Sequence, residues 1–240
     1  MSDTRIGQFD GKPLVYDRSA PSHYGVGGVP TKPYINAEFA KQCEKCFAEL
    51  FSFMDKHAGL VVESILTGGV SRAGMGTSLH HKNRAFDLDA FLFADGSNWV
   101  ATTFPQRPQL YLGIEAILRR HFGTVLSYDY NAAHRDHFHF DNGTNVGFKQ
   151  SAKSHVIFIQ NVLTFVYQIP AGRDGVWGPE TEREVTALRK QLEIGPFSTK
   201  SNWLEFLSTA AKAAFELEAG KVGDLEPLEP LVCECCGRPF

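Results

Sequence analysis

Residues 84–93 read RAFDLDAFLF, and apolar and acidic side chains alternate in the middle of this stretch. In an extended chain Phe86 and Leu88 point to one face, whereas Asp87 and Asp89 point to the other. This period of two predicts a β-strand whose apolar face packs on a core and whose acidic face lines a cleft.

Residues 137–141, HFHFD, predict a second strand of the same kind. His137 and His139 share one face, and Phe138 and Phe140 take the other. Further elements flank these two strands, and Gly59 and Gly123 follow the ends of the two predicted helices. They are strands at about 60–66, 99–104 and 124–127, helices at about 37–57 and 107–122, and a Gly-rich loop at 68–77. The pattern predicts an α+β fold with a small antiparallel sheet and flanking helices.

The chain changes character near residue 150, because only helical patterns follow, at about 152–168, 179–193 and 201–219. At the other end, several prolines and a Gly-rich stretch predict irregular structure. We therefore expect an irregular arm over 1–35, an α+β domain over 36–148, a small all-α domain over 149–220 and a flexible, cysteine-bearing tail over 221–240.

Composition excludes several classes of protein. Of 240 residues 43% are hydrophobic, which excludes wholesale disorder, and 24 Lys and Arg against 27 Asp and Glu give no basic excess for nucleic acid. No apolar run approaches the ~18 residues of a membrane span. The first residues lack the basic and apolar pattern of a secretory signal. We expect synthesis in the cytoplasm and, if the protein acts outside it, export or injection by another route.

Histidines and carboxylates gather in two short clusters, SLHHKNRAFD at 78–87 and HRDHFH at 134–139. A catalytic zinc ion takes three protein ligands of this kind and leaves a fourth position for water. One His and one Asp from the first cluster and one His from the second would complete such a site. The alternative is a scatter of surface histidines, but the combination of His80, Asp87, His137 and His139 favours a metal site.

The combined pattern resembles a known family. Ser78-x-His80 with Asp87, followed by Asp136-His137-Phe138-His139, is similar to the zinc peptidases of the D-Ala-D-Ala carboxypeptidase group, which is often grouped with lysostaphin and the hedgehog signalling domain. Residues 129–139 look most like the bacterial extensin-like branch of that group. The resemblance covers about residues 60–143.

The resemblance implies a role for each matching residue. His80, Asp87 and His139 correspond to the Zn²⁺ ligands, and Asp136 to the general base. His137 corresponds to a residue that helps to stabilise the tetrahedral intermediate. Arg72 corresponds to the arginine that polarises the scissile carbonyl or holds a substrate carboxylate, and Ser78 to a hydroxyl that binds substrate or orders the loop. Four further residues are rival ligands or support the ligands: His81, Asp89, His134 and Asp141.

The sequence departs from the family pattern at two positions. Asn83 stands where the family has Gly, and Asn tolerates a left-handed backbone better than most residues. The base is Asp136 rather than a glutamate. An ideal strand would also put Asp136 on the face opposite His137, so we expect it at an irregular start of the strand.

Residues 174–181, DGVWGPET, predict a turn that runs into a helix. This string resembles the D-G-x-[FW]-G-x-x-T signature of peptidoglycan-binding helical domains, and Ile159–Leu163 is similar to their L-Q-x-x-L helix. The resemblance covers about 154–194 and implies that Asp174 and Trp177 bind cell wall. Trp177 is either a stacking ring or a core anchor, and we favour the core.

Two groups of cysteines have C-x-x-C spacing: Cys43 and Cys46, and a tail group of Cys233, Cys235 and Cys236. They could form a second metal site or a disulfide. Buried or free thiols are favoured, because Cys43 and Cys46 lie on the apolar face of the first predicted helix.

Both resemblances imply one polymer. We expect a zinc metallopeptidase that hydrolyses D-amino-acid bonds in peptidoglycan stems or cross-links, as a carboxypeptidase or an endopeptidase, in the periplasm or cell wall. The alternative is a non-catalytic wall-binding protein with a structural or decayed metal site. A third possibility is an antibacterial effector or lysin, with a secretion machine or an immunity protein as partner.

Overall fold

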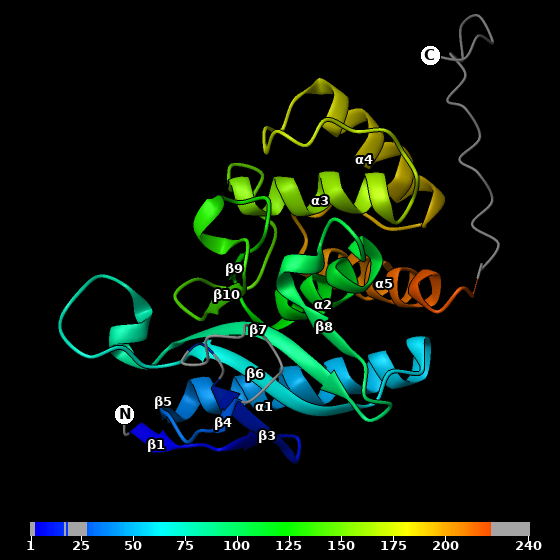
Figure 1. Cartoon of the computed structure of the whole chain (residues 1–240). Helices are drawn as coiled ribbons and strands as arrows, with labels where there is room; N and C mark the ends of the chain where they lie inside the picture. The colour runs from blue at the N-terminus through cyan, green and yellow to red at the C-terminus, as the bar shows by residue number, and fades with distance from the viewer. Residues whose placement is uncertain (1–2, 17, 19–27, 222–240) are drawn as a thin grey trace, which may run out of the picture.

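The structure, a computed structural model, describes residues 3–16, 18 and 28–221 and has the expected α+β class. An eight-stranded sheet has the order β2-β3-β6-β7-β10-β9, with β4 beside β3 and β8 beside β7 (Figure 1). Its strands are β2 (Gln8–Phe9), β3 (Lys12–Tyr16), β4 (Val29–Pro30), β6 (Val62–Gly69), β7 (Ala85–Phe93), β8 (Asn98–Val100), β9 (Thr124–Leu126) and β10 (Phe138–Asp141). A separate pair joins β1 (Asp3–Arg5) to β5 (Tyr34–Asn36).

The expectation of an irregular arm over residues 1–35 is wrong for the described part of that segment. β3 pairs in parallel with β6, with Leu14 opposite Ile65, so the N-terminal segment extends the main sheet and makes it mixed. Phe9 and Leu14 are buried in the core. These strands are short and two contain proline, which hides their period in the sequence. Residues 17 and 19–27 lie outside the described part.

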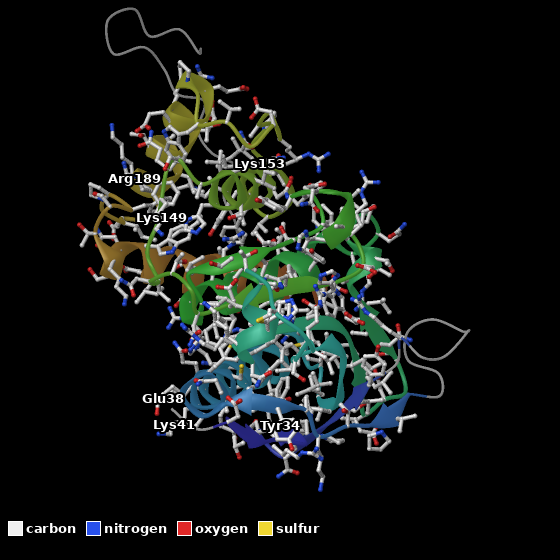
Figure 2. The ribbon with its side chains drawn as sticks, turned by 90° about the vertical axis from the view of Figure 1, so that its left-hand side faces the viewer. Tyr34, Glu38, Lys41, Lys149, Lys153 and Arg189 are labelled. Carbon is white, nitrogen blue, oxygen red and sulfur yellow. The ribbon has the colours of Figure 1, made fainter. Side chains whose placement is uncertain are left out.

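Two helices cover the apolar face of the sheet. In α1 (Ala37–Phe53), the Asn36 side chain caps the first turn, and a π-helical turn, η1 (Met54–Ala58), carries the chain to Gly59, which is left-handed at φ 69°. The outer face of α1 is polar, and Glu38 pairs there with Lys41 at 3.1 Å (Figure 2). The second helix, α2 (Pro108–His121), begins with proline at its first position and ends before Gly123, as predicted.

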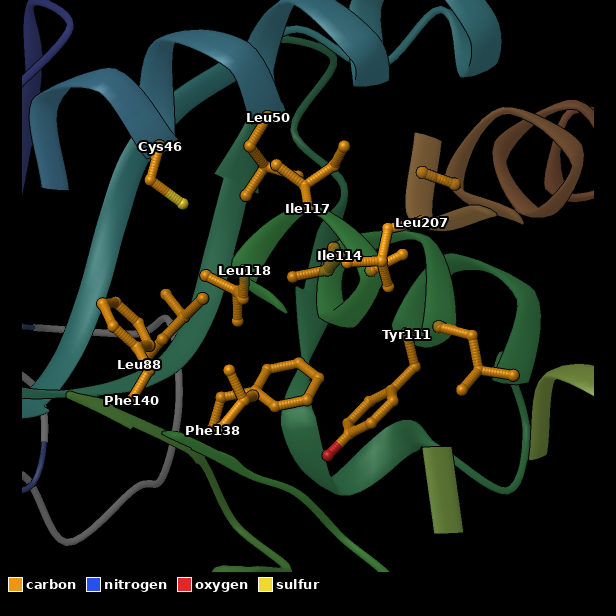
Figure 3. Packing of buried hydrophobic residues seen from close by; sticks show 14 of the residues in the cluster. Cys46, Leu50, Leu88, Tyr111, Ile114, Ile117, Leu118, Phe138, Phe140 and Leu207 are labelled. Carbon is orange, nitrogen blue, oxygen red and sulfur yellow. The ribbon is translucent and has the colours of Figure 1, made fainter. Parts of the chain in front are cut away.

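The strands β7 and β10 form the centre of the core. Leu88 lies opposite Phe138 across the antiparallel pair, and both side chains are fully buried. Figure 3 shows Leu88 and the β10 phenylalanines packed against side chains of α2, with α1 above them and Leu207 beyond. The apolar face of both predicted strands is therefore confirmed.

The predicted strand at 99–104 is wrong in its second half. β8 ends at Val100, and Ala101–Thr103 form a 3-10 turn, η3, in which the Thr103 hydroxyl donates to the Val100 carbonyl at 2.6 Å. This local bond satisfies a carbonyl that a longer strand would have paired with a neighbour.

The three predicted C-terminal helices are present as α3 (Lys153–Phe165), α4 (Pro179–Gln191) and α5 (Lys200–Glu218). α5 packs closely on α2, because a Cβ atom at Gly113 would lie 2.7 Å from the Phe215 ring. Arg119 of α2, buried with Glu115, donates to the Ser154 carbonyl of α3 at 2.7 Å. Buried side chains of 36–148 and 149–220 join in one hydrophobic cluster. The boundary near residue 149 stays a prediction.

Cys43 and Cys46 are free, fully buried thiols on α1, and burial raises the pKa of both. They pack as small apolar side chains, as the helical pattern predicts. Cys233, Cys235 and Cys236 lie outside the described residues, so a second metal site stays a prediction. Within the described ranges, no helix is long and apolar enough to cross a membrane.

Candidate metal centre

Three predicted ligands converge at the edge of the core. Candidate ligand atoms of His80, Asp87 and His139 all lie within 4.8 Å of one another. His80 Nε2 and His139 Nδ1 each lie 3.1 Å from Asp87 Oδ1, and the two ring nitrogens are 3.2 Å apart. Two imidazoles and one carboxylate are a ligand set that zinc uses in hydrolytic sites.

Local structure places His80 and Asp87 on either side of a turn. His80 lies in the 3-10 helix η2 (Leu79–Lys82), and Ser78 caps this helix by accepting the His80 N–H at 3.4 Å. Asn83 then adopts the left-handed conformation, with φ 55° and ψ 33°, and turns the chain into β7. Asparagine therefore forms the turn at the position where the resembled sequence pattern has glycine. Its side chain also donates to Asp3 Oδ2 at 2.8 Å.

Strand register supplies the third residue. His139 lies directly opposite Asp87 in the antiparallel pair of β10 and β7. Both side chains point away from the aromatic core, on the face predicted from the period of two.

Outer partners orient both imidazoles. His80 Nδ1 lies 3.1 Å from the Val70 carbonyl oxygen, which can only accept, so this nitrogen carries the proton and Nε2 is the free ligand atom. His139 Nε2 lies 3.1 Å from Asp141 Oδ2, which leaves Nδ1 for a metal. Asp141, a rival ligand in the sequence, therefore supports His139. The donor set fits a divalent cation such as zinc.

The electrostatics of this cluster also fit a cation. Burial opposes ionisation of Asp87, but hydrogen bonds from His139 and His80 hold its pKa well below the usual range. Burial likewise opposes the charged form of His139, but Asp141 and Asp87 raise its pKa to about 9. A proton on His139 balances the two carboxylates, and a bound cation would take its place.

Asp136 and His137 lie beside the three ligands. Asp136 lies in a bend two residues before Phe138, the first residue of β10, so it is outside the regular strand as expected. The carboxylate Oδ1 lies 2.6 Å from His137 Nδ1, and His137 Nε2 lies 3.6 Å from Asp87 Oδ1. Burial raises the pKa of Asp136, but the His137 hydrogen bond and the charge of Arg18 outweigh this effect and lower it. Its side chain is 44% exposed, so the carboxylate is accessible to substrate.

The His134 ring lies beside that of His137. The two ring centroids are 5.1 Å apart, and Nδ1 of His134 lies 2.7 Å from Asn131 Oδ1. Burial and the neighbouring imidazoles lower its pKa to about 4.

Arg72 and His81 are not brought to the three ligands. The Arg72 side chain is exposed on the protruding loop between β6 and η2 (Figure 1), and its guanidinium has no hydrogen bond or ion pair to a described residue. Its main chain orders the loop, because its N–H donates to the His80 carbonyl at 3.1 Å and its carbonyl accepts from His81 Nδ1 at 3.2 Å.

Arg18 is the residue that sequence reasoning missed. Its Nε and Nη2 each lie 2.8 Å from an oxygen of Asp89, and Nη2 lies 4.0 Å from Asp136 Oδ2. Asp89 is fully buried on the same face of β7 as Asp87. A buried carboxylate needs a cation, and that signal was present in the sequence. The spacing of 71 residues gave no indication of which cation.

In the segment between α3 and α4, Asp174 and Trp177 have identifiable structural contacts. Asp174 Oδ1 accepts from the Val176 N–H and from Gln160 Nε2 of α3, both at 2.9 Å, which fixes the predicted turn. Trp177 packs on Phe148, with ring centroids 5.2 Å apart. With Phe197 they line a cavity of about 240 Å³, which Arg189, labelled in Figure 2, also lines. Binding of cell wall by Asp174 or Trp177 stays a prediction.

Residues 68–151 match a family model described as Extensin-like protein C-terminus. The match contains the whole cluster from Arg72 to Asp141 and agrees with the branch predicted from residues 129–139. It ends before the peptidoglycan-binding-like segment 154–194, so that resemblance stays a prediction. Neither the curated proteins nor the solved structures gave a match.

Proposed function

We propose that the protein is a zinc-dependent peptidase that hydrolyses D-amino-acid bonds of bacterial peptidoglycan. One observation carries the proposal: His80 Nε2, Asp87 and His139 Nδ1 converge, and each imidazole is oriented by an outer acceptor. This arrangement suits a metal hydrolase, and the accessible Asp136 beside it suits a proton carrier. The substrate class rests on the two sequence resemblances, which both imply cell wall.

Zinc bound by these residues would lower the pKa of a water molecule and polarise the scissile carbonyl. Asp136 then accepts a proton from the attacking water and returns it to the leaving amine. Since Oδ1 of Asp136 is held by His137 Nδ1, Oδ2 is the atom available for this transfer. His137 keeps the carboxylate in place through Nδ1. With a proton on each ring nitrogen, it would also donate from Nε2 to the developing negative charge.

The alternative of a non-catalytic wall-binding protein depended on Asn83 in place of glycine. Asn83 adopts the left-handed turn, so this substitution does not disturb the positions of His80 and Asp87. We therefore favour catalysis. Because peptidoglycan lies outside the cytoplasm, we propose action in the periplasm or cell wall, with delivery by export or injection.

Product analysis tests this function. The full chain, loaded with zinc, is incubated with purified muropeptides, and products are identified by mass spectrometry with and without a chelator. We expect zinc-dependent loss of D-amino acids or opening of cross-links. Asp136→Asn, which has a similar shape, should reduce the rate by about 10²–10⁴-fold with the zinc content unchanged.

The outcomes distinguish the hypotheses. Zinc-loaded protein that binds muropeptides without new products would support a binding protein. Wild-type rates in Asp136→Asn would remove the assignment of the base. His80→Ala with unchanged zinc content would remove the ligand set.

A further inference from the structure

Arg18 reaches the proposed site from outside the segment that matches the family model. It follows β3, and its guanidinium is anchored side-on to Asp89 through Nε and Nη2, both at 2.8 Å. Asp89 is fully buried, whereas 30% of the Arg18 side chain is exposed. The Nε–Nη2 edge of the guanidinium is therefore fixed in the protein, while part of the Arg18 side chain stays accessible.

The second edge of the guanidinium is suited to a carboxylate. A guanidinium has two edges that can each bind a carboxylate in a bidentate fashion. Asp89 occupies the Nε–Nη2 edge, and the Nη1–Nη2 edge has no acceptor at hydrogen-bond distance among the described residues. Asp136 Oδ2, at 4.0 Å from Nη2, is too distant for a hydrogen bond.

A glycine in β6 leaves room for the Arg18 side chain against the sheet. Gly68 lies in β6, and a Cβ atom built there would be 2.3 Å from Arg18 Nε and 2.4 Å from Cζ. Any larger residue at position 68 would displace the guanidinium. A substitution at Gly68 can therefore displace the Arg18 side chain while Arg18 and Asp89 themselves remain unchanged.

Arg18 lies close to the proposed metal centre. Its Nη2 is 4.0 Å from Asp136 Oδ2, and His137, which holds Asp136, lies 3.6 Å from Asp87 Oδ1 through its Nε2. Asp89, which holds Arg18, is two residues from the ligand Asp87, and the register of β7 against β6 shifts between Leu88 and Ala90, so the two carboxylates are separated by less than about 7 Å along the strand. One extended residue spans roughly 3.3–3.6 Å, and a hydrogen bond adds about 2.9 Å. A carboxylate one residue beyond a carbonyl at the metal centre therefore reaches Arg18.

The charges also require a cation at this position. Without such a cation, Asp89 and Asp136 would repel an anionic peptide end. Arg18 pairs with Asp89, lies near Asp136 and keeps donors that no described residue uses, so it offsets that repulsion.

We propose that Arg18 determines specificity by binding the free C-terminal carboxylate of the substrate, one residue past the bond that is cut. The inference rests on the proposed peptidase function. It identifies the preferred substrate as a peptide with a free end and the preferred reaction as removal of the last residue. The interior bond of a cross-link has no carboxylate at that position.

Paired substrates test the proposal. Two stem peptides of one sequence end in a D-Ala carboxylate or in the D-Ala carboxamide, and kcat/KM is measured for both with the zinc-loaded full chain. Because charge-assisted hydrogen bonds are strong, we expect the wild type to prefer the acid by about 10–100-fold. Calorimetric binding of the same peptides to chelator-treated protein gives a readout that does not require catalysis, and it should show the same preference.

Three variants should lose the preference. Arg18→Gln removes the charge, Arg18→Gln with Asp89→Asn removes it without leaving a buried charge unpaired, and Gly68→Ala displaces the intact guanidinium. In each, the acid-to-amide ratio should approach one. A loss of stability alone would lower both rates equally and leave the ratio unchanged. Arg183→Gln is the matched control, because Arg183 lies on α4 and pairs there with Glu184.

Several results would overturn the proposal. A wild type that treats both peptides equally would refute it while leaving peptidase activity established. Loss of the preference in Arg72→Gln, with Arg18→Gln unaffected, would assign the carboxylate to Arg72. If no peptide is cut but the acid binds preferentially through Arg18, the carboxylate site stands and the peptidase proposal fails.

Discussion

The hydrogen bond between Asp141 and His139 shows how a residue outside the ligand set controls a ligand. Asp141 Oδ2 holds His139 Nε2 at 3.1 Å, while its Oδ1 accepts the Gly143 N–H at 2.8 Å. The carboxylate thereby fixes both the ring orientation and the nitrogen that faces Asp87.

Replacing Asp141 with asparagine should weaken zinc binding by about 10–100-fold, because the imidazole loses its charged partner. Titration with a competing chelator measures this affinity. Asp95→Asn is the matched control, since Asp95 also caps the N–H two residues ahead, that of Ser97, at 2.8 Å. Equal zinc affinity in Asp141→Asn and wild type would show that Asp141 is only a turn residue.

His155 makes the stability of the protein depend on pH. Burial and the charge of Arg119 lower its pKa to about 3, and its Nδ1 accepts the Lys149 N–H at 3.0 Å. Below about pH 6.5 His155 therefore binds a proton in the unfolded chain but not in the folded chain. The free energy of unfolding consequently decreases as pH falls from about 6.5 toward 3.

Between pH 7 and pH 5 this residue should lower the free energy of unfolding by about 2 kcal/mol. Urea unfolding of chelator-treated wild type and His155→Asn at both pH values tests this. The metal cluster titrates in both proteins, so its contribution cancels, and the variant should lose about 2 kcal/mol less. Parallel pH profiles would contradict the shift.

Residues with local patterns were predictable, and residues joined by long-range contacts were not. Spacing alone placed Asp87 and His139 on polar strand faces, and the structure brings them together. The resemblance suggested Arg72 as the site's guanidinium, and this stays a prediction, whereas the structure shows a second guanidinium, that of Arg18, beside Asp89 and Asp136. No periodicity links Arg18 to Asp89, because their contact depends on the parallel pairing of β3 with β6.

At the scale of elements, the turn from η2 into β7 depends on one backbone conformation. Asn83 ends η2 at φ 55°, and its N–H donates to the His80 carbonyl at 3.2 Å. Alanine at this position would have the steric strain of a Cβ atom in the left-handed conformation but would lack the hydrogen bond that the Asn83 side chain donates to Asp3.

Asn83→Ala should lower the free energy of unfolding by about 1–2 kcal/mol, whereas Asn83→Gly should stay close to wild type. Chemical unfolding measures both, and zinc titration reports whether His80 and Asp87 keep their spacing. If alanine is as well tolerated as glycine, the left-handed turn does not limit stability at this position.

Element prediction succeeded where a long pattern repeats and failed where the signal is short. The five helices have enough residues to show an apolar face, and their ends lie close to the expected caps. β2 and β4 contain two residues each, too few to show any period. The sequence of β8 and η3 predicted one continuous strand because apolar residues continue from β8 into η3.

At the scale of the whole molecule, the hydrophobic core does not stop at the expected boundary near residue 149. Trp99 of β8 and Trp203 of α5 are both buried in the same cluster, and α2 contacts α5. A shared core makes the two segments depend on each other for stability.

We therefore expect one cooperative unfolding transition for the described body of the protein. Two variants test this, one retaining only Trp99 and the other only Trp203, with phenylalanine at the remaining tryptophans. Their urea midpoints by fluorescence should agree with each other and with circular dichroism of the same variant. Clearly separated transitions would instead support two independent domains.

The alignment of β10 with β7 sets His139 opposite Asp87. A slip of one residue would turn every β10 side chain to the opposite face, so a phenyl ring would replace the imidazole beside Asp87. A cation that needs both residues binds only correctly aligned chains. Such an ion would take part in the reaction and would also stabilise, during folding, only the strand register that assembles the catalytic site.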